Sequence, residues 1–231
     1  MKKGKGFFIT AEGLDGSGKT TQVRLIQDYL ICKGHNTFVV REPGGTAISE
    51  SIRKLILDPA NVEMSPVVEM LLYAASRAQL VEQVIRPALE RGEVVICDRF
   101  FDSSIAYQGF GRGLEVSMIA DVNRTALRGL APDLTFFFDL PPQASLARRS
   151  QAEGGSSGNE DSAGSGNSGL DRIEREKLDF HGRVYNGYKW LAANSPDRIR
   201  VIDAASDEAA VFEKVKEWLD LYIDGIGGIL R

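Results

Sequence analysis

The chain has 231 residues and a formal net charge of −4, with acidic and basic residues interspersed. This length supports one substantial α/β core, and the mixed charge pattern excludes the broad cationic surface of a nucleic-acid or membrane-surface binder. A basic start is followed by an apolar run at 7–11 that ends at Glu12. Because that run is too short for a signal peptide or a membrane span, we expect a cytoplasmic protein that binds small molecules, with no nucleic-acid or membrane partner.

Short apolar runs alternate with segments of helical periodicity. Buried strands are predicted at 7–11, 37–40, 94–97, 134–140 and 200–202. Helices are predicted at 19–33, 47–58, 115–128, 142–150, 171–194 and 207–222, with another that begins at Ser65-Pro66, ends at Gly92 and is interrupted at Pro87. Gly34 stands where a left-handed C-terminal cap would be. The alternation predicts a parallel sheet with a ligand crevice at the carboxyl ends of its strands.

The first strand leads into a phosphate-binding loop of the pattern G-x-x-x-x-G-K-[ST]. The loop consists of Gly13, Leu14, Asp15, Gly16, Ser17, Gly18, Lys19 and Thr20, and we assign Thr21 to the same ATP site. Glycines let the backbone N–H groups surround phosphate oxygens at the start of a helix. We expect Lys19 to be an exposed cation for the β/γ phosphates and Thr20 to contact Mg²⁺. The alternative, a chance glycine-rich turn, does not explain the strand before it and the helix after it.

Cations follow two of the other predicted strands. Asp98 and Arg99 end the third strand, where Asp98 can hold Mg²⁺ or its waters and Arg99 can clamp a phosphate. Arg41 leaves the second strand, and Arg53 lies on the following helix. A surface ion pair is the alternative for Asp98-Arg99 taken alone. We therefore interpret Arg41, Arg53 and Arg99 together as three cations that converge on one anion.

The chain has only two histidines, and neither stands in a pattern for activating a nucleophile. A phosphate monoester has a second pKa near 6, so at neutral pH it is a nucleophile that needs no general base. It needs charge neutralisation and in-line positioning. The sequence therefore favours a phosphate acceptor over a hydroxyl acceptor.

Tyr73 and Arg77 are four residues apart on a predicted helix and share one face. The ring can stack on a base while the guanidinium reaches the edge of that base. The alternative is a core aromatic residue with a solvated arginine.

We expect residues 1–231 to form a single domain in which 148–172 are a mobile lid. Within that lid, 152–168 are rich in Gly and Ser and have no apolar residue larger than Ala, which predicts a flexible insertion.

Together these motifs resemble the thymidylate kinase family, in the order and spacing of that family. The resemblance rests on Arg41-Glu42-Pro43-Gly44-Gly45-Thr46, on the stretch from Asp98 to Gln108 and on Leu170-Asp171-Arg172-Ile173-Glu174. It implies an α/β P-loop NTPase fold with a five-stranded parallel sheet of order 2-3-1-4-5 flanked by helices. It also implies a homodimer and the transfer of the γ-phosphoryl group of MgATP to dTMP, giving dTDP and ADP.

The same resemblance implies roles for individual residues. The dTMP phosphate would lie at Arg41, Arg53 and Arg99, and thymine would stack on Tyr73, with Arg77, Ser103, Ser104 and Gln108 around the nucleotide. Asp15 would reach the sugar hydroxyl or a metal-bound water, and Tyr107 would fill the space of a ribose 2′-OH. Thr20, Asp98 and Glu42 would order the Mg²⁺ and its waters.

Two departures from the family pattern stand out. Phe100 replaces the tyrosine that usually follows the Asp-Arg pair. Bacterial relatives with a Gly-Ser loop, like Gly16-Ser17 here, place arginines just before the Leu-Asp-Arg-Ile-Glu segment, where this chain has Gly, Ser and Asn. We therefore assign catalysis by a lid cation to Arg172 and Arg149, and ATP contact to Arg148.

Two alternatives remain at this stage. Another nucleoside or nucleotide kinase would share the loop and the Asp-Arg pair. A GTP-dependent switch would need Asp-x-x-Gly and Asn-Lys-x-Asp motifs, which do not occur in a usable place.

Overall fold

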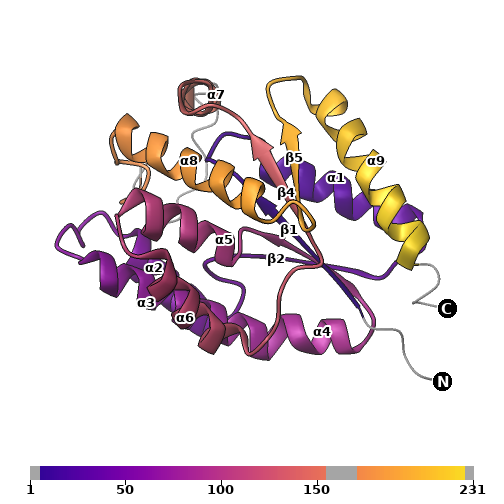
Figure 1. The fold of residues 1–231 in the computed structure, drawn as a ribbon, viewed down its shortest axis with the longest axis horizontal. Coiled ribbons are helices and arrows are strands. Elements are labelled where there is room, and N and C mark those ends of the chain that lie inside the picture. The colour runs from indigo at the N-terminus through magenta and orange to yellow at the C-terminus, as the bar shows by residue number, and fades with distance from the viewer. Residues whose placement is uncertain (1–5, 155–170, 227–231) are drawn as a thin grey trace, which may run out of the picture.

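The computed structural model describes residues 6–154 and 171–226, which are built around a five-stranded sheet (Figure 1). The strands are β1 (Phe7–Glu12), β2 (Thr37–Arg41), β3 (Val94–Asp98), β4 (Leu134–Asp139) and β5 (Ile199–Asp203). They lie in the order β2-β3-β1-β4-β5, and every neighbouring pair is parallel. The predicted strands and the sheet order are therefore confirmed.

Helices cover both faces of the sheet. They are α1 (Lys19–Cys32), α2 (Ala47–Leu57), α3 (Pro66–Leu80), α4 (Arg86–Glu90), α5 (Phe101–Ser104), α6 (Val116–Leu127), α7 (Pro142–Gly154), α8 (Leu178–Asn194) and α9 (Glu208–Ile226), with π-helical segments η1 (Val81–Ile85) and η2 (Ile105–Gly111). On one face α1 and α9 pack side by side over Ile9, Ile96 and Phe136. On the other face Phe8 and Val95 meet η1 and α4, while Phe137 meets η2 and α8.

Helix ends follow the expected signals. Ser65 Oγ accepts a hydrogen bond from Val68 N at 3.3 Å, and Pro66 occupies the first turn of α3. Gly34 has φ +87° directly after α1, as a left-handed cap requires. The long helix that begins at Pro66 widens to a π-helical turn at η1 just before Pro87, which removes one backbone donor.

The predicted helix at 171–194 begins only at Leu178. Asp171 Oδ1 accepts from the backbone N–H groups of Ile173 and Glu174 at 2.9 and 2.8 Å, and Glu174 Oε2 accepts from Asp171 N at 3.0 Å. These local side-chain bonds stabilise a turn at 171–177 in place of helix. Arg172 therefore lies in this turn and does not begin a helix.

Two other segments differ from expectation. Helix α7 continues to Gly154, beyond the predicted end at 150. The stretch at 101–111, to which the sequence patterns assign no element, forms α5 and η2. Most of the insertion expected at 152–168, and with it the middle of the lid expected at 148–172, lies outside the described residues, as does Leu170.

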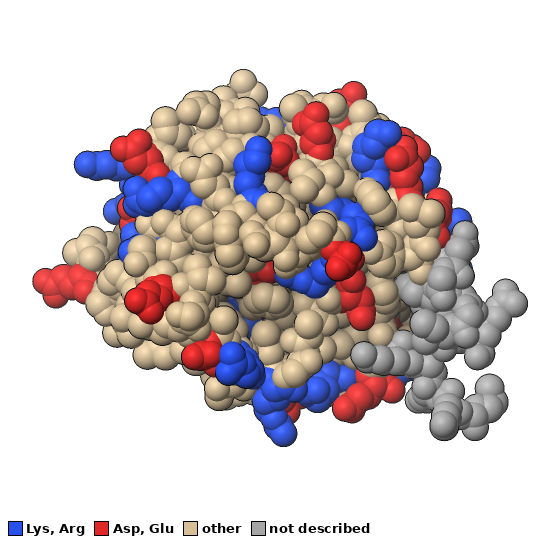
Figure 2. Space-filling model, viewed as in Figure 1, with Lys and Arg blue, Asp and Glu red and all other residues tan. Residues whose placement is uncertain are grey.

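Among the residues that the structure describes, no helix combines the length and apolar character needed to cross a membrane. On the face shown in Figure 2, basic and acidic side chains are mixed and form no large area of one sign.

Candidate functional site

The phosphate-binding loop joins β1 to α1 in a backbone path that requires glycine. Gly13, Gly16 and Gly18 have φ values of +142°, +85° and +86°. A Cβ on Gly16 would lie 2.5 Å from the carbonyl oxygen of Ser145, so side-chain bulk is excluded there as well. Ser145, on α7, also donates from Oγ to the Asp15 carbonyl. The loop is thus held against α7.

Lys19 is buried and not exposed as the sequence suggests, because only 6% of it is accessible. Its Nζ donates to the Leu14 carbonyl at 2.7 Å and lies 4.0 Å from Asp15 Oδ1. Burial, and then the charge of Arg99, lowers the pKa of Lys19 to about 8. A neighbouring phosphate would favour the charged form of this amine.

Thr20 and Asp98 bring a hydroxyl and a carboxylate together at the carboxyl end of β3. Thr20 Oγ1 donates to Asp98 Oδ2 at 2.8 Å. Glu42 lines the same cavity as Thr20 and Asp98, and the Oε1 atom of Glu42 is buried without a hydrogen-bond partner. Mg²⁺ is usually held by one or two protein oxygens together with water and substrate phosphates, so these residues fit that ion. Within 6–154 and 171–226 no cluster of three His, Cys, Asp or Glu side chains forms a metal cage.

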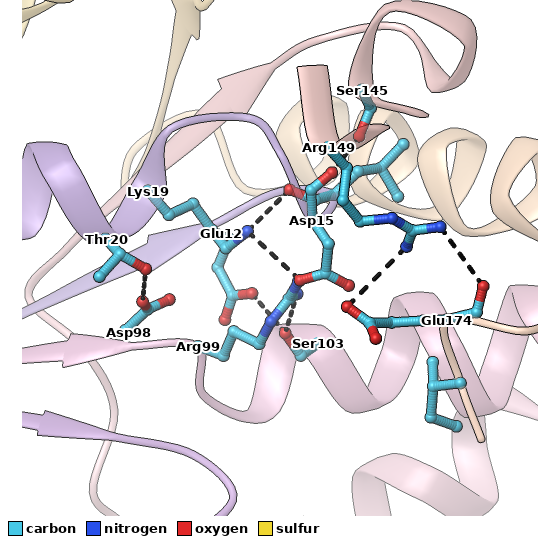
Figure 3. A network of polar contacts seen from close by, with 12 residues as sticks. Glu12, Asp15, Lys19, Thr20, Asp98, Arg99, Ser103, Ser145, Arg149 and Glu174 are labelled. Carbon is cyan, nitrogen blue, oxygen red and sulfur yellow. Dashed lines mark hydrogen bonds and ion pairs between the residues drawn. The ribbon is translucent and has the colours of Figure 1, made fainter. Parts of the chain in front are cut away.

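Arg99 occupies a strained backbone position with φ +68°. Its Nη2 donates to Asp15 Oδ1 at 2.6 Å, and its Nη1 donates to Tyr188 OH at 3.0 Å and to Ser103 Oγ at 3.3 Å. Figure 3 shows Lys19 and Arg99 both directed at Asp15. Although burial opposes ionisation, Arg99 and Lys19 hold the pKa of Asp15 below its ordinary value.

Glu12 lies beneath this group and is nearly inaccessible. It accepts hydrogen bonds from Phe100 N at 2.7 Å, from Ser103 Oγ at 2.6 Å and from Tyr188 OH at 3.0 Å. The hydroxyls of Ser103 and Tyr188 therefore accept hydrogen bonds from Arg99 and donate hydrogen bonds to Glu12. Burial, and then the charge of Asp102, raises the pKa of Glu12 to about 7.

Two adjoining cavities open beside the loop. The first contains most of the predicted acceptor residues: Asp15, Glu42, Arg53, Tyr73, Arg99, Ser103, Ser104, Tyr107 and Gln108. The second is lined by the loop and by all three predicted phosphate-binding arginines, Arg41, Arg53 and Arg99, together with Lys19, Thr20 and Asp98. Asp15, Glu42, Arg53 and Arg99 border both cavities, which therefore meet at these side chains.

Arg77 is not among the residues that line the acceptor cavity, although the sequence suggests the edge of the base for it. Its Nε donates to Glu42 at 2.8 Å, Nη1 to Asn123 at 2.6 Å and Nη2 to the Phe100 carbonyl at 3.3 Å. Burial raises the pKa of Glu42 to about 7 although Arg77 opposes that shift.

A third cavity lies on the other side of the loop, between α1, α7 and the start of α9. It is lined by five residues assigned to ATP from the sequence, Gly16, Ser17, Gly18, Thr21 and Arg148, together with Ser206 and Asp207. Arg148 is fixed there by hydrogen bonds to the carbonyls of Ala204 and Ala205 at 2.7 and 2.9 Å.

The two candidate lid cations have different surroundings. Arg149, on α7, lies beside the loop with Nη1 3.9 Å from Glu174 Oε1 (Figure 3). Arg172 is buried, with Nη2 2.6 Å from Glu69 Oε2 and Nε donating to the Ile56 carbonyl at 2.9 Å. Arg149 and Asp15 thus line one small cavity, whereas the side chain of Arg172 is bound to Glu69 and to the Ile56 carbonyl.

Several residues of the site belong to no sequence motif that would indicate their role. Glu12, Glu69, Ser145 and Tyr188 reach the site from four different elements. Glu12 alone carries a usable signal, because an acidic residue that ends a buried strand needs partners.

The fold and site together define a P-loop phosphotransferase: a phosphate-binding loop between the first strand and helix, opposite an arginine-lined cavity. The family model described as thymidylate kinase matches residues 11–215, and the chain belongs to the thymidylate kinase family.

Individual relatives agree with that assignment. The chain is 48% identical over 213 residues to a thymidylate kinase of Exiguobacterium sp., covering 92% of this chain and 93% of the relative. It is 46% identical over 210 residues to one of Prosthecochloris aestuarii, covering 91% of each chain. The crystal structure of thymidylate kinase from Ehrlichia chaffeensis matches with a TM-score of 0.71 and 32% identity, covering 94% of this chain and 99% of that one.

Proposed function

We propose that the protein transfers the γ-phosphoryl group of ATP to the phosphate of dTMP, giving ADP and dTDP. The observation that carries this proposal is that the phosphate loop and the acceptor cavity meet at one group of charged side chains, Asp15, Glu42, Arg53 and Arg99. The acceptor cavity has aromatic walls, Tyr73 and Tyr107, which suit a flat base.

The residues divide the work of an in-line transfer. Arg53 and Arg99 neutralise and orient the acceptor phosphate, whose oxygen attacks the γ-phosphorus while the bond to the β-phosphate oxygen breaks. Lys19 and the loop N–H groups bind the phosphates of the donor. Mg²⁺, when held by Thr20 and Asp98, would supply further charge neutralisation. Since the acceptor phosphate is ionised, no residue has to remove a proton.

A panel of monophosphates tests the proposal. Release of ADP should be fastest with dTMP, slower with dUMP and near background with UMP or AMP. The reason is that Tyr107, which is buried and lines the acceptor cavity, is assigned to fill the space that a ribose 2′-OH needs. Omission of Mg²⁺ should abolish ADP release. Comparable turnover of AMP would indicate another nucleotide kinase, and hydrolysis of GTP without an acceptor would indicate a switch.

Two arginines that line different cavities give a matched pair of variants. Arg53→Ala should raise KM for dTMP by about tenfold or more and leave KM for ATP unchanged, because it leaves acceptor charge uncompensated. Arg148→Ala should do the reverse, since Arg148 lines the cavity on the donor side. Steady-state kinetics with each substrate varied in turn would check this. A rise in KM for ATP in Arg53→Ala as well as in Arg148→Ala would contradict the assignment.

We infer in addition that the protein forms a homodimer through α3 and α6. Val67, Val68 and Leu71 are on the exposed side of α3, at 42, 47 and 49% accessibility, and Met118 on the neighbouring α6 is 40% exposed. An apolar surface of this kind is usually covered by a partner.

A further inference from the structure

Glu69, on α3, is a fully buried carboxylate where three segments of the chain meet. It accepts hydrogen bonds from Gln108 Nε2 at 2.8 Å, from Arg112 Nη2 at 3.0 Å and from Arg172 Nη2 at 2.6 Å. Burial raises the pKa of Glu69, but Arg112, Gln108 and Arg172 outweigh burial and hold it below its ordinary value. Glu69 is therefore ionised and can only accept hydrogen bonds.

This anion determines which way the Gln108 amide faces. An ionised carboxylate has no proton to donate, so the amide must turn its nitrogen, and not its oxygen, toward Glu69. Gln108 also lines the acceptor cavity, and no described residue donates to its Oε1. The oxygen is thus the end of the amide that remains for a ligand.

Two hydroxyls that line this cavity have no such fixed polarity. Ser104 Oγ and Tyr107 OH are buried without partners, and a hydroxyl can rotate to donate or to accept. The guanidinium of Arg77 is engaged by Glu42, Asn123 and the Phe100 carbonyl. Arg53 and Arg99 are assigned to the acceptor phosphate. Among the uncharged side chains that line the acceptor cavity, Gln108 is therefore the one whose polarity is fixed, so that it can distinguish a donor from an acceptor on a base.

We propose that Glu69 is a positioning residue for base selection: it orients Gln108 so that the cavity accepts a pyrimidine with a ring N–H and rejects one with a bare ring nitrogen. Thymine and uracil carry that N–H, which donates to Gln108 Oε1. Cytosine presents a lone pair at the same position, which Oε1 repels. This inference rests on the proposed function, because it assumes that the cavity holds the base of the acceptor.

The test is the ratio of kcat/KM for dTMP to kcat/KM for dCMP. Gln108→Met keeps the bulk but removes the acceptor, and it should lower the ratio by about tenfold or more. Glu69→Gln should lower this ratio similarly, because a neutral amide at position 69 can donate or accept a hydrogen bond. The Gln108 amide could then face it in either orientation. In the double variant the ratio should equal that of Gln108→Met alone, since the effect of Glu69 passes through Gln108.

Glu176→Gln is the matched control. Glu176 pairs with Arg112 in the same network but makes no hydrogen bond to Glu69 or Gln108. This variant should leave the ratio unchanged even if its melting temperature falls. If Glu69→Gln fails to fold, the paired variant Glu69→Gln with Arg112→Gln removes one of the two cations that Glu69 pairs with and should show the same lowered ratio.

The outcomes separate the two proposals. A wild-type protein that does not phosphorylate dTMP would overturn the proposed function. A wild-type protein that uses dTMP, with an unchanged ratio in Gln108→Met or in a folded Glu69 variant, would overturn the assignment of Glu69.

Discussion

Lys19 is a cation with a buried side chain, and these two properties conflict unless an anion is bound beside it. Its amine is buried next to Arg99, and its pKa is lowered to about 8 by burial and by that neighbour. A cation in such surroundings costs free energy until an anionic ligand arrives. The site is thus prepared for phosphate at the expense of stability.

Lys19→Met should therefore lower kcat by at least about a thousandfold and leave the melting temperature of the ligand-free protein equal or higher. The variant removes the charge that contacts the transferring group and also removes its burial cost. Single-turnover kinetics and calorimetry on the same preparation would check both parts. Turnover within a few-fold of wild type would exclude the proposed site.

Glu12 gives a pH dependence with a definite sign. Its pKa is raised from 4.5 to about 7 by burial and then by Asp102. Between these values the folded protein holds a proton that the unfolded chain has lost, so the contribution of Glu12 to stability falls as pH rises through this window. The neutral form is the one that the folded protein prefers.

Glu12→Gln keeps the shape without the charge. Its melting temperature, relative to wild type, should rise between pH 4.5 and about 7 and change little beyond that window. Scanning calorimetry at several pH values would measure the difference, in which groups common to both proteins cancel. A difference that is constant with pH would show that Glu12 titrates normally.

At the scale of elements, the sheet and the motif-bearing loops could be predicted because their signals are local. Strands such as β3 are continuous apolar runs, and the glycines of 13–18 follow a known spacing. The turn at 171–177 was predicted wrongly as helix because the side-chain bonds of Asp171 and Glu174 compete with helical ones.

Contacts between distant elements could not be predicted from the sequence in the same way. Tyr188 reaches Arg99 from α8, and Glu69 reaches Arg172 across 103 positions. Neither pairing leaves a pattern in the sequence, because it depends on how helices pack over the sheet. Arg172 is the clearest example: its motif indicates function, while its environment is a buried ion pair.

The different settings of Arg149 and Arg172 predict different kinds of damage. Arg149→Ala should lower kcat by about 10²-fold or more with little loss of stability, because Arg149 borders the loop and Asp15. Arg172→Ala should lower the melting temperature by about 5–10 °C, because it removes a buried cation from Glu69.

Kinetics at saturating ATP and dTMP, with a thermal melt of each variant, would separate the two. Because the sequence motif favours Arg172 as a catalytic cation, a large fall in kcat for a fully stable Arg172→Ala would restore that assignment. Normal kcat in Arg149→Ala would remove Arg149 from it.

At the scale of the whole molecule, exposed apolar side chains occur on opposite sides. Leu71 is on α3, beside α2 and α6, whereas Leu221 is on α9 near the C-terminus, beyond the sheet (Figure 1). The α3 side chain has apolar neighbours on its own helix, Val67 and Val68, and Met118 lies on the adjacent helix α6. A stable interface needs a contiguous surface of about 800 Å² per partner, which favours the α3 side.

Leu71→Glu should therefore convert the protein to a monomer, because it places a charge in the centre of the inferred dimer surface. Leu221→Glu is the control, with a side chain 68% exposed in the wild type, and should keep the wild-type mass. Light scattering after size exclusion, at several protein concentrations, would measure both. Leu71 is not among the residues that line the two cavities, so the monomer should still bind dTMP. A wild-type protein that is monomeric at all concentrations would refute the dimer, and dissociation by Leu221→Glu alone would move the interface to α9.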